Sequence, residues 1–320
     1  MKRIVSISLC VFAVLAAIPA RAAEKVAVGI VGGFNAFTWP AAIALAEGFY
    51  AQRGLAPEVI FMPSSPGMLQ QLAAGSLDIA GSAGLVDPVR LIARRAPIAL
   101  GRIELRVSPY DLVAKPQFKS IADLKGRNVA IGSRNDITFI LIAKMLASAG
   151  LKPDDVEMMY SGSTVSRYAA LKAGAFDATF LAPPLSFIAQ GDGFRSLGIA
   201  GDYAKDLPFT GSIVNRSWAA AHPEAAKDFF AANDAATDWF RDPAHRDAAI
   251  KILIDMGKSN PADAARSYDF LHGGDYFDDS HAVSRRAVAA LVAALHELGD
   301  SDVNPTPEQT VIAGVTALGE

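Results

Sequence analysis

The sequence contains the same segment twice, about one hundred residues apart. Leu69 to Gly84 reads LQQLAAGSLDIAGSAG, and Tyr168 to Pro184 reads YAALKAGAFDATFLAPP. A glycine that follows an amphipathic stretch can adopt the left-handed conformation that ends a helix, and an apolar strand comes next in both copies. The repeat therefore predicts two units with the same local structure. Three residue pairs recur with a constant offset of 99: Leu72 and Leu171, Gly75 and Gly174, Asp78 and Asp177.

Each copy is preceded by a second matching stretch. Residues 47–62, EGFYAQRGLAPEVIFM, contain a helix end, a Gly-Leu stop and an apolar strand, and residues 144–160, KMLASAGLKPDDVEMMY, repeat that order. Apolar strands precede both helices, at residues 25–31 and 127–132. Alternation of strands with helices is typical of parallel sheets covered by helices. The sequence therefore predicts an α/β protein of two lobes, and 320 residues are enough for two packed cores.

The remaining segments fit around these two units. Strands are expected at Ile98–Leu105 and Pro109–Lys115, between the units. The segment after the second unit predicts a strand and then a long helix that starts near Pro223, a residue type favoured in the first helical turn. The C-terminal third predicts helices only. We expect these helices to pack on the first lobe, because they have no sheet of their own.

The first 22 residues have the layout of a secretory signal peptide. Lys2 and Arg3 precede an apolar stretch from Ile4 to Ile18, and residues 20–22 form a small-x-small cleavage pattern. The alternative is an uncleaved membrane anchor, but the apolar stretch is shorter than the roughly 20 residues needed to span a bilayer. We therefore expect export and a periplasmic location.

The single cysteine and the charge limit the chemistry of the exported chain. Cys10 lies inside the predicted signal peptide, so the mature chain would have no thiol for disulfides, thiolate catalysis or metal ligation. The formal net charge of the full sequence is −3, and loss of the three basic residues in the signal peptide changes it to −6. This balance gives no basic surplus for nucleic-acid binding.

Six loops follow the predicted parallel strands, where ligands of open α/β sheets bind beside helix N-termini. Helix capping explains any single polar side chain in these loops. The recurrence of Ser, Thr, Asn and Gly at the strand ends nevertheless predicts a site for a small polar or anionic molecule. Phe34, Phe37 and Trp39 either add apolar surface to that site or pack at a helix start. The loops are residues 32–40, 63–67, 81–84, 132–136, 161–164 and 182–184.

We find no motif for catalysis or cofactor binding. The sequence has no G-x-S-x-G, G-x-x-x-x-G-K-[ST] or H-E-x-x-H motif, and GIVGGF lacks the spacing of a dinucleotide fingerprint. Asp78 and Asp177 are expected to have structural roles at strand starts. We therefore expect a non-catalytic protein without cofactor or metal. The richest acid and imidazole segment, HGGDYFDDSH, is better explained by a solvated loop than by a metal site; it contains His272, Asp275, Asp278, Asp279 and His281.

Taken in order, the segments resemble the type II periplasmic substrate-binding proteins of ABC importers. The similarity is to the nitrate/sulfonate/taurine group, which also contains binders of thiamine precursors, and it covers most of the mature chain. It implies a first lobe from residues 23–110 and 207–320, a second lobe from residues 111–206, two crossing strands and closure about a hinge. The segments that carry it are AIALAEGFYAQRGLAPEVI, LQQLAAGSLDIAGSAG, SIADLKGRNVAIGS, ASAGLKPDDVEMM, AALKAGAFDATFLAPP and AAAHPEAAKDFFAANDAATDW.

The resemblance also implies the site and the partners. The expected partners are a small-molecule ligand and an inner-membrane ABC permease, with the binding protein as a monomer. The ligand-binding residues carried over by position are Phe34, Asn35, Thr38, Ser64, Ser65 and Ser82 in the first lobe, and Ser133, Asn135, Ser163 and Pro183 in the second.

The sequence leaves the ligand open. Neutral donors and helix dipoles could hold a sulfonate or nitrate, because Arg134 is the one basic residue seen at these positions. Asp136 beside the same loop would repel an anion, and it suits a zwitterion such as taurine or an amino-pyrimidine. The aromatic first loop leaves room for an aromatic acid. A secreted enzyme on the same scaffold, or a protein that delivers its ligand to a sensor, are the rival functions.

Overall fold

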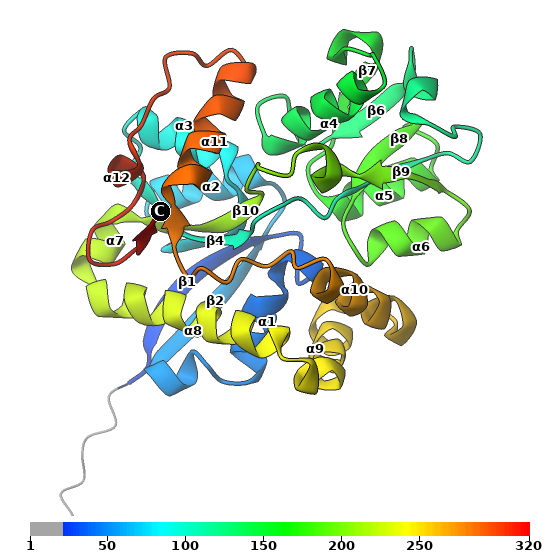
Figure 1. Cartoon of the computed structure of the whole chain (residues 1–320). Coiled ribbons are helices and arrows are strands. Elements are labelled where there is room, and N and C mark those ends of the chain that lie inside the picture. Colours follow the sequence, from blue (N-terminus) through cyan, green and yellow to red (C-terminus); the bar gives the residue numbers. More distant parts are fainter. Residues whose placement is uncertain (1–21) are drawn as a thin grey trace, which may run out of the picture.

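The computed structural model describes residues 22–320, so the predicted signal peptide, residues 1–22, lies outside the described residues except for its last position. The described chain forms two five-stranded sheets, each flanked by helices (Figure 1). The first sheet has the order β2-β1-β3-β10-β4, with β1 Glu24–Val31, β2 Leu55–Met62, β3 Ile79–Gly84, β4 Ile98–Leu105 and β10 Thr210–Asn215. The second has the order β7-β6-β8-β5-β9, with β5 Asp111–Ala114, β6 Asn128–Ile131, β7 Glu157–Tyr160, β8 Ala178–Leu181 and β9 Arg195–Ile199.

The two sheets have the same topology. In the first, β1 is parallel to β2 and β3, whereas β10 is antiparallel to both β3 and β4. In the second, β6 is parallel to β7 and β8, whereas β5 is antiparallel to both β8 and β9. One strand of each sheet thus opposes four that share a direction. That strand is the first one the chain forms after it crosses from the other lobe, from β4 to β5 and from β9 to β10.

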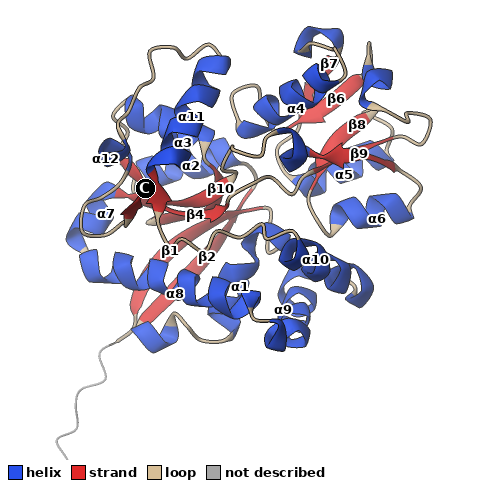
Figure 2. Ribbon diagram, in the orientation of Figure 1, coloured by secondary structure: helices blue, strands red, loops and turns tan. Residues whose placement is uncertain are grey.

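Helices flank both sheets, and in the first lobe they lie on both sides of the strands (Figure 2). Helices between strands of the first sheet are α1 Trp39–Ala46, α2 Ser65–Ala73 and α3 Val86–Ala93. The second sheet carries α4 Ile137–Ser148, α5 Thr164–Lys172 and α6 Leu185–Gly191. The chain continues after β10 with α7 Arg216–Ala221, α8 Pro223–Arg241, α9 Arg246–Gly257, α10 Pro261–Gly273, α11 Arg285–Glu297 and α12 Pro307–Thr310.

The sequence repeat corresponds to a structural repeat. Gly75 and Gly174 have φ values of 78° and 81°, so both occupy the left-handed conformation that was expected after α2 and α5. Asp78 Oδ2 accepts a hydrogen bond from Ala27 N at 2.8 Å. Asp177 Oδ2 accepts the equivalent hydrogen bond from Asn128 N at 3.2 Å. Both aspartates therefore tie the start of their own strand, β3 or β8, to the neighbouring strand, β1 or β6, which is the structural role at strand starts that the sequence indicated.

The C-terminal helices pack on the first lobe, as expected. The α8 helix lies along α1, and α11 and α12 pack against α3. Trp39 is fully buried and its Nε1 donates to Ala249 O at 2.9 Å, which joins α1 to α9. Trp39 thus belongs to the packing of the first lobe. Helix α10 also reaches the second lobe, where Arg266 Nη2 donates to Gln190 Oε1 at 2.9 Å.

Three secondary-structure predictions were wrong. The third strand was expected at residues 77–80, but β3 runs from Ile79 to Gly84, so the expected loop at 81–84 is part of the strand. This extension pairs with β10, more than a hundred residues away, and no local pattern reveals that pairing. Strand β9 was not predicted, because its half-exposed edge residues lack an apolar run. The C-terminal third, expected to be helical only, contains a two-stranded parallel pair, β11 Val283–Ser284 and β12 Leu318–Gly319.

Candidate ligand-binding site

A cavity of about 390 Å³ lies between the two sheets. Residues from both sheets line it, and most of them follow the carboxyl ends of β1, β2, β3, β6 and β7. The strand ends of both lobes thus converge on one space, as the position of the polar loops predicted.

The ten predicted site residues divide into two groups. Seven line the cavity: Phe34, Asn35, Thr38, Ser64, Ser65, Ser82 and Ser163. Ser133, Asn135 and Pro183 are not among the lining residues. Asn135 is exposed in the loop before α4, and Pro183 is buried in the loop between β8 and α6. In the loop between β6 and α4, Gly132 and Asp136 line the cavity.

The serines at the two equivalent helix starts act as caps and also line the cavity. Ser64 Oγ accepts a hydrogen bond from Gly67 N at 3.4 Å and caps α2. Ser163 Oγ accepts from Ser166 N at 3.2 Å and caps α5. Each serine thus keeps its helix N-terminus directed at the cavity. Backbone N–H groups and helix dipoles at such positions favour an anionic group.

Ser82 has the most unusual backbone in the site. Its φ of 49° lies in the left-handed region, which is uncommon for a residue other than glycine. The register between β3 and β10 shifts at this point, as at a β-bulge. The Ser82 hydroxyl forms a short hydrogen bond to Glu104, and Ser212 bonds the other carboxylate oxygen of Glu104. Burial raises the pKa of Glu104, while these hydrogen bonds oppose the rise.

Arg167 lines the cavity but was not predicted. Its side chain is 1% exposed, and all five of its N–H groups have acceptors within the protein. The acceptors are Phe180 O at 3.0 Å, Ser161 O at 3.1 Å, Gly162 O at 2.8 Å, Tyr110 Oη at 3.2 Å and Thr164 Oγ1 at 3.3 Å. The repeat could have revealed it, because the equivalent position in the first copy is the fully buried Met68. A charged residue at a position that the fold buries points to a functional role.

Three aromatic rings form part of the cavity wall where the chain crosses between the lobes. Tyr110 precedes β5 and Phe209 precedes β10, and their ring centroids are 5.1 Å apart. Phe37 packs edge-on against both, at 5.1 Å and 5.2 Å. The crossing segments and the first loop are thereby joined in one apolar cluster.

Two carboxylates give another part of the wall negative charge. Asp136 caps α4 by accepting from Thr138 N at 2.8 Å, and burial raises its pKa. Burial raises the pKa of Asp87 to about 6, and the ion pair with Arg90 opposes that rise. Arg90 also donates from Nε to Asp300 at 2.7 Å and from Nη1 to Asn135 O at 2.7 Å. The second of these bonds links the two lobes.

The lobes touch at further places beside the cavity. A Cβ atom on Gly84 would lie 3.2 Å from Ile137 Cγ2. A Cβ atom on Gly162 would lie 3.2 Å from Pro63 O and 3.6 Å from Ser64 Cβ. Outside the cavity, Lys144 pairs with Glu297 at 2.9 Å, and the Arg266 guanidinium lies 4.0 Å from the centroid of the Phe187 ring. The two lobes are therefore in contact at several places around the cavity.

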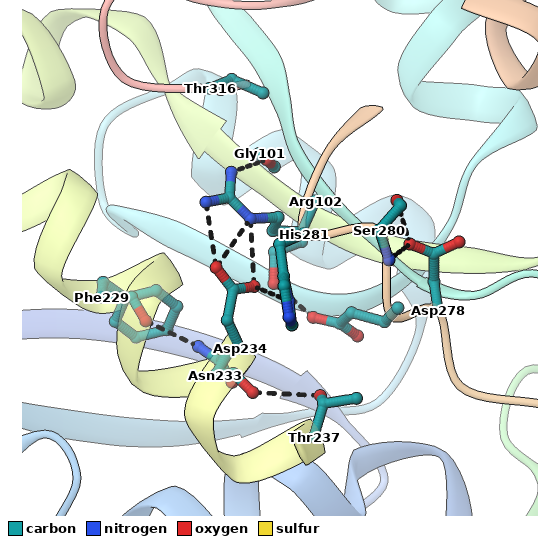
Figure 3. A network of polar contacts seen from close by, with 12 residues as sticks. Gly101, Arg102, Phe229, Asn233, Asp234, Thr237, Asp278, Ser280, His281 and Thr316 are labelled. Carbon is teal, nitrogen blue, oxygen red and sulfur yellow. Dashed lines mark hydrogen bonds and ion pairs between the residues drawn. The ribbon is translucent and has the colours of Figure 1, made fainter. Parts of the chain in front are cut away.

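The acidic segment HGGDYFDDSH forms ion pairs and hydrogen bonds. His281 lies 3.4 Å from Asp234 and 3.2 Å from Asp238, and Asp234 also pairs with Arg102 at 3.1 Å (Figure 3). His272 Nε2 lies 2.9 Å from Arg241 O. Within residues 22–320, no three side chains of the His, Cys, Asp and Glu types are placed to hold a metal ion.

Comparison with known proteins identifies the family. Residues 38–245 match the family described as NMT1/THI5-like. The chain belongs to the NMT1/THI5-like family. A relative from Brucella abortus, named as a binding protein, is 30% identical to this family member over 206 residues. The match covers 62% of this chain and 61% of that relative's length.

Solved structures share the fold of this NMT1/THI5-like protein. The alkanesulfonate-binding protein SsuA from Xanthomonas axonopodis pv. citri, bound to MOPS, has a TM-score of 0.74 at 20% identity, with 92% of this chain and 99% of that chain covered. The periplasmic nitrate-binding protein NrtA from Synechocystis has a TM-score of 0.67 at 20% identity, with 76% and 70% covered. The fold is thus the two-lobed periplasmic-binding-protein fold that the sequence resembled. None of the helices in residues 22–320 is long and apolar enough to cross a membrane.

Proposed function

We propose that this protein is the extracytoplasmic solute-binding component of an ABC importer and that it captures a small molecule between two hinged lobes. The observation that carries the proposal is the cavity of about 390 Å³ between the strand ends of both sheets, a size that suits a small organic ligand. The chain crosses between the lobes twice, before β5 and before β10, and these crossings offer a place for the hinge. In this role the protein works in the periplasm as a monomer and delivers its ligand to a membrane permease.

The polar wall of the cavity supports a ligand with an acidic group. The N-termini of α2 and α5 favour an anion, and the Arg167 guanidinium adds a positive charge beside the first turn of α5. Because Arg167 already uses all five donors within the protein, it acts on the ligand mainly through its charge. A sulfonate matches these features, and the name of the Xanthomonas neighbour is consistent with that choice.

The carboxylates of Asp87 and Asp136 support a second group of opposite character. Both line the cavity and would repel a bare anion such as nitrate. An amino group or another hydrogen-bond donor on the ligand would offset that repulsion. We therefore propose an aminosulfonate of the taurine type, or a comparable zwitterion, as the ligand class. The aromatic wall of Phe37, Tyr110 and Phe209 favours one alternative, a pyrimidine-type or aromatic acid ligand that packs on these rings.

Ligand screening tests this proposal. Residues 23–320 would be analysed by native mass spectrometry, stripped of any bound molecule, and then melted with nitrate, taurine, alkyl and aryl sulfonates, aromatic carboxylates and pyrimidines. A ligand at 100 times its dissociation constant should stabilise the protein by about 2.7 kcal/mol. A taurine-type ligand that comes off the protein unchanged supports the proposal. No shift with any of these compounds contradicts the ligand class, and chemical conversion of a ligand favours the rival enzyme.

A variant pair tests whether capture needs the lobes to meet. Gly162→Val places methyl groups against Pro63 of the other lobe, whereas Gly191→Val is a matched control with no atom within 4 Å of its Cβ. Overpacking of about 1–3 kcal/mol should weaken ligand binding by roughly 5- to 150-fold in the first variant and leave the second unchanged. Equal affinities for the two variants would contradict capture by closure at this edge.

A further inference from the structure

A strip of exposed apolar side chains lies beside the cavity. Among residues 22–320, the large apolar residues with high exposure gather on the last residues of β2 and β7 and on the first turn of α5. Soluble proteins rarely expose such a cluster without a function. The exposed fractions are 41% for Ile60, 54% for Phe61, 41% for Met159, 51% for Tyr160 and 58% for Val165.

These residues lie near the ends of equivalent strands in the two lobes. β2 and β7 are the equivalent edge strands of the two sheets, and their pairing with β1 and β6 makes Met62 the counterpart of Tyr160, so Phe61 lies one residue before that position. Phe61 is two residues before Pro63, and Tyr160 is two residues before Gly162, where the lobes touch. Each lobe thus contributes one aromatic side chain to the same edge of the cavity.

The apolar strip is continuous with the cavity. Tyr160 and Val165 themselves line the cavity, as does Phe34. The Phe34 ring packs edge-on against Phe61, with centroids 5.5 Å apart. Successive side chains of a strand point to opposite faces, so Ile60 points away from the face of β2 that carries Phe61, and Met159 points away from the face of β7 that carries Tyr160. The part of the strip that extends the cavity is therefore Phe61, Tyr160 and Val165, which we call the apolar rim.

We propose that the apolar rim binds an apolar substituent of the ligand, whose polar group lies in the cavity. This inference rests on the proposed function and refines it: the natural ligand carries an alkyl or aryl group beside its acidic group. Removing apolar surface from water strengthens binding roughly fourfold for each fully buried methylene group. Because the rim is open on one side, we expect about a twofold gain for each methylene group.

The test uses taurine and 2-aminoalkane-1-sulfonates whose alkyl chain is lengthened by one methylene group at a time, titrated into residues 23–320 by calorimetry. The amino group keeps each probe within the proposed ligand class. Phe61→Thr, Tyr160→Thr and Val165→Thr, combined in one variant, remove the rim from exposed positions. The matched control combines Ile60→Thr with Met159→Thr, which are as exposed but lie on the other faces of the same strands. We expect affinity to rise about twofold per methylene group in the wild type and the control, and to be independent of chain length in the rim variant.

Fluorescence of 8-anilinonaphthalene-1-sulfonate gives a second measurement that does not depend on the natural ligand. The wild type and the control should enhance its fluorescence equally, and the rim variant should lose most of the enhancement. If short and long sulfonates bind equally well to the wild type, the rim inference is wrong while the proposed function stands. If no aminosulfonate binds but the rim variant loses dye binding, the ligand class fails and the rim remains an apolar site. If the rim variant still binds the dye, the inference is overturned. In that case, a rim variant that binds ligand with unchanged affinity but no longer supports transport would show that the rim contacts the permease.

Discussion

A designed disulfide across the cavity edge would test whether the two lobes approach each other in solution as closely as they do in the structure. The ideal Cβ position of Gly162 lies 3.6 Å from Ser64 Cβ, although the two residues belong to different lobes. Disulfide-bonded cysteines have Cβ atoms about 3.5–4.5 Å apart. The variant Ser64→Cys with Gly162→Cys should therefore oxidise with only a small adjustment at Pro63, whose carbonyl oxygen lies 3.2 Å from the same Cβ position. The sequence suits this design because its single cysteine, Cys10, lies in the predicted signal peptide.

The stabilisation can be estimated from the loop that the bond closes. A cross-link that closes a loop of about 100 residues stabilises by about 4.7 kcal/mol in the chain-entropy account. Loss of the Ser64 cap on α2 subtracts about 1 kcal/mol. We expect a net gain of about 3–4 kcal/mol in the oxidised protein, which corresponds to a rise of roughly 5–10 °C in the melting temperature. The same bond should hold a bound ligand and slow its release until the bond is reduced.

Thiol titration and melting with and without reductant are the assays. The oxidised double variant should show no free thiol and a melting temperature that falls on reduction, while each single variant should melt independently of reductant. Ser64→Cys alone isolates the cost of the lost cap. If both thiols of the double variant stay free under oxidising conditions, the edges of β2 and β7 do not meet in solution and the closed arrangement is refuted.

Three further variants test the packing and the buried charges. Arg167→Lys keeps the positive charge but has too few donors for the five acceptors around it, so chemical denaturation should show a loss of about 3 kcal/mol. Gly101→Ala places a Cβ 2.2 Å from the Phe230 ring and should cost about 1–3 kcal/mol, whereas Gly191→Ala, with open space around its Cβ, should be nearly neutral. Burial raises the pKa of Asp111 from 3.8 in the unfolded chain to about 6, so the free energy of unfolding should rise by up to about 3 kcal/mol as pH falls from 7 to 4 relative to Asp111→Asn. A pH profile shared by the wild type and the variant would contradict this assignment.

The parts of the fold that depend on local sequence were predictable. Strand β4 was expected at Ile98–Leu105 and has those bounds: Pro97 precedes its apolar start, and apolar residues then alternate with Arg102 and Glu104 up to Leu105. The left-handed glycines Gly75 and Gly174 were recognised from their position after a helix. The parts that depend on distant pairing were not predictable. The second half of β3 reads as a polar loop and becomes a strand because β10 pairs with it.

The same distinction applies to the candidate site. Ser64 and Ser163 were found because a helix start has a local signature, and the fold then directs both starts into one cavity. Ser133 and Asn135 had a similar signature, but they are not among the cavity-lining residues, and Asp136 is the residue that caps α4. Whether the seven predicted residues that line the cavity bind the ligand stays a prediction.

Comparison of the two copies, position by position, separates scaffold from specificity. Where the copies agree, as at the capping serines and at Asp78 and Asp177, the residues hold helix ends and strand starts in place. Where they differ at a buried position, one copy carries a charged side chain, Arg167, and the other an apolar one, Met68. The packing of the fold does not require this charge. A buried guanidinium is tolerated because five acceptors surround it, and three of them, on Ser161, Gly162 and Thr164, belong to the loop and helix start that follow β7 at the cavity. The repeated fold thus explains where the cavity lies. The differences between its two halves determine which charges lie at each side of the cavity.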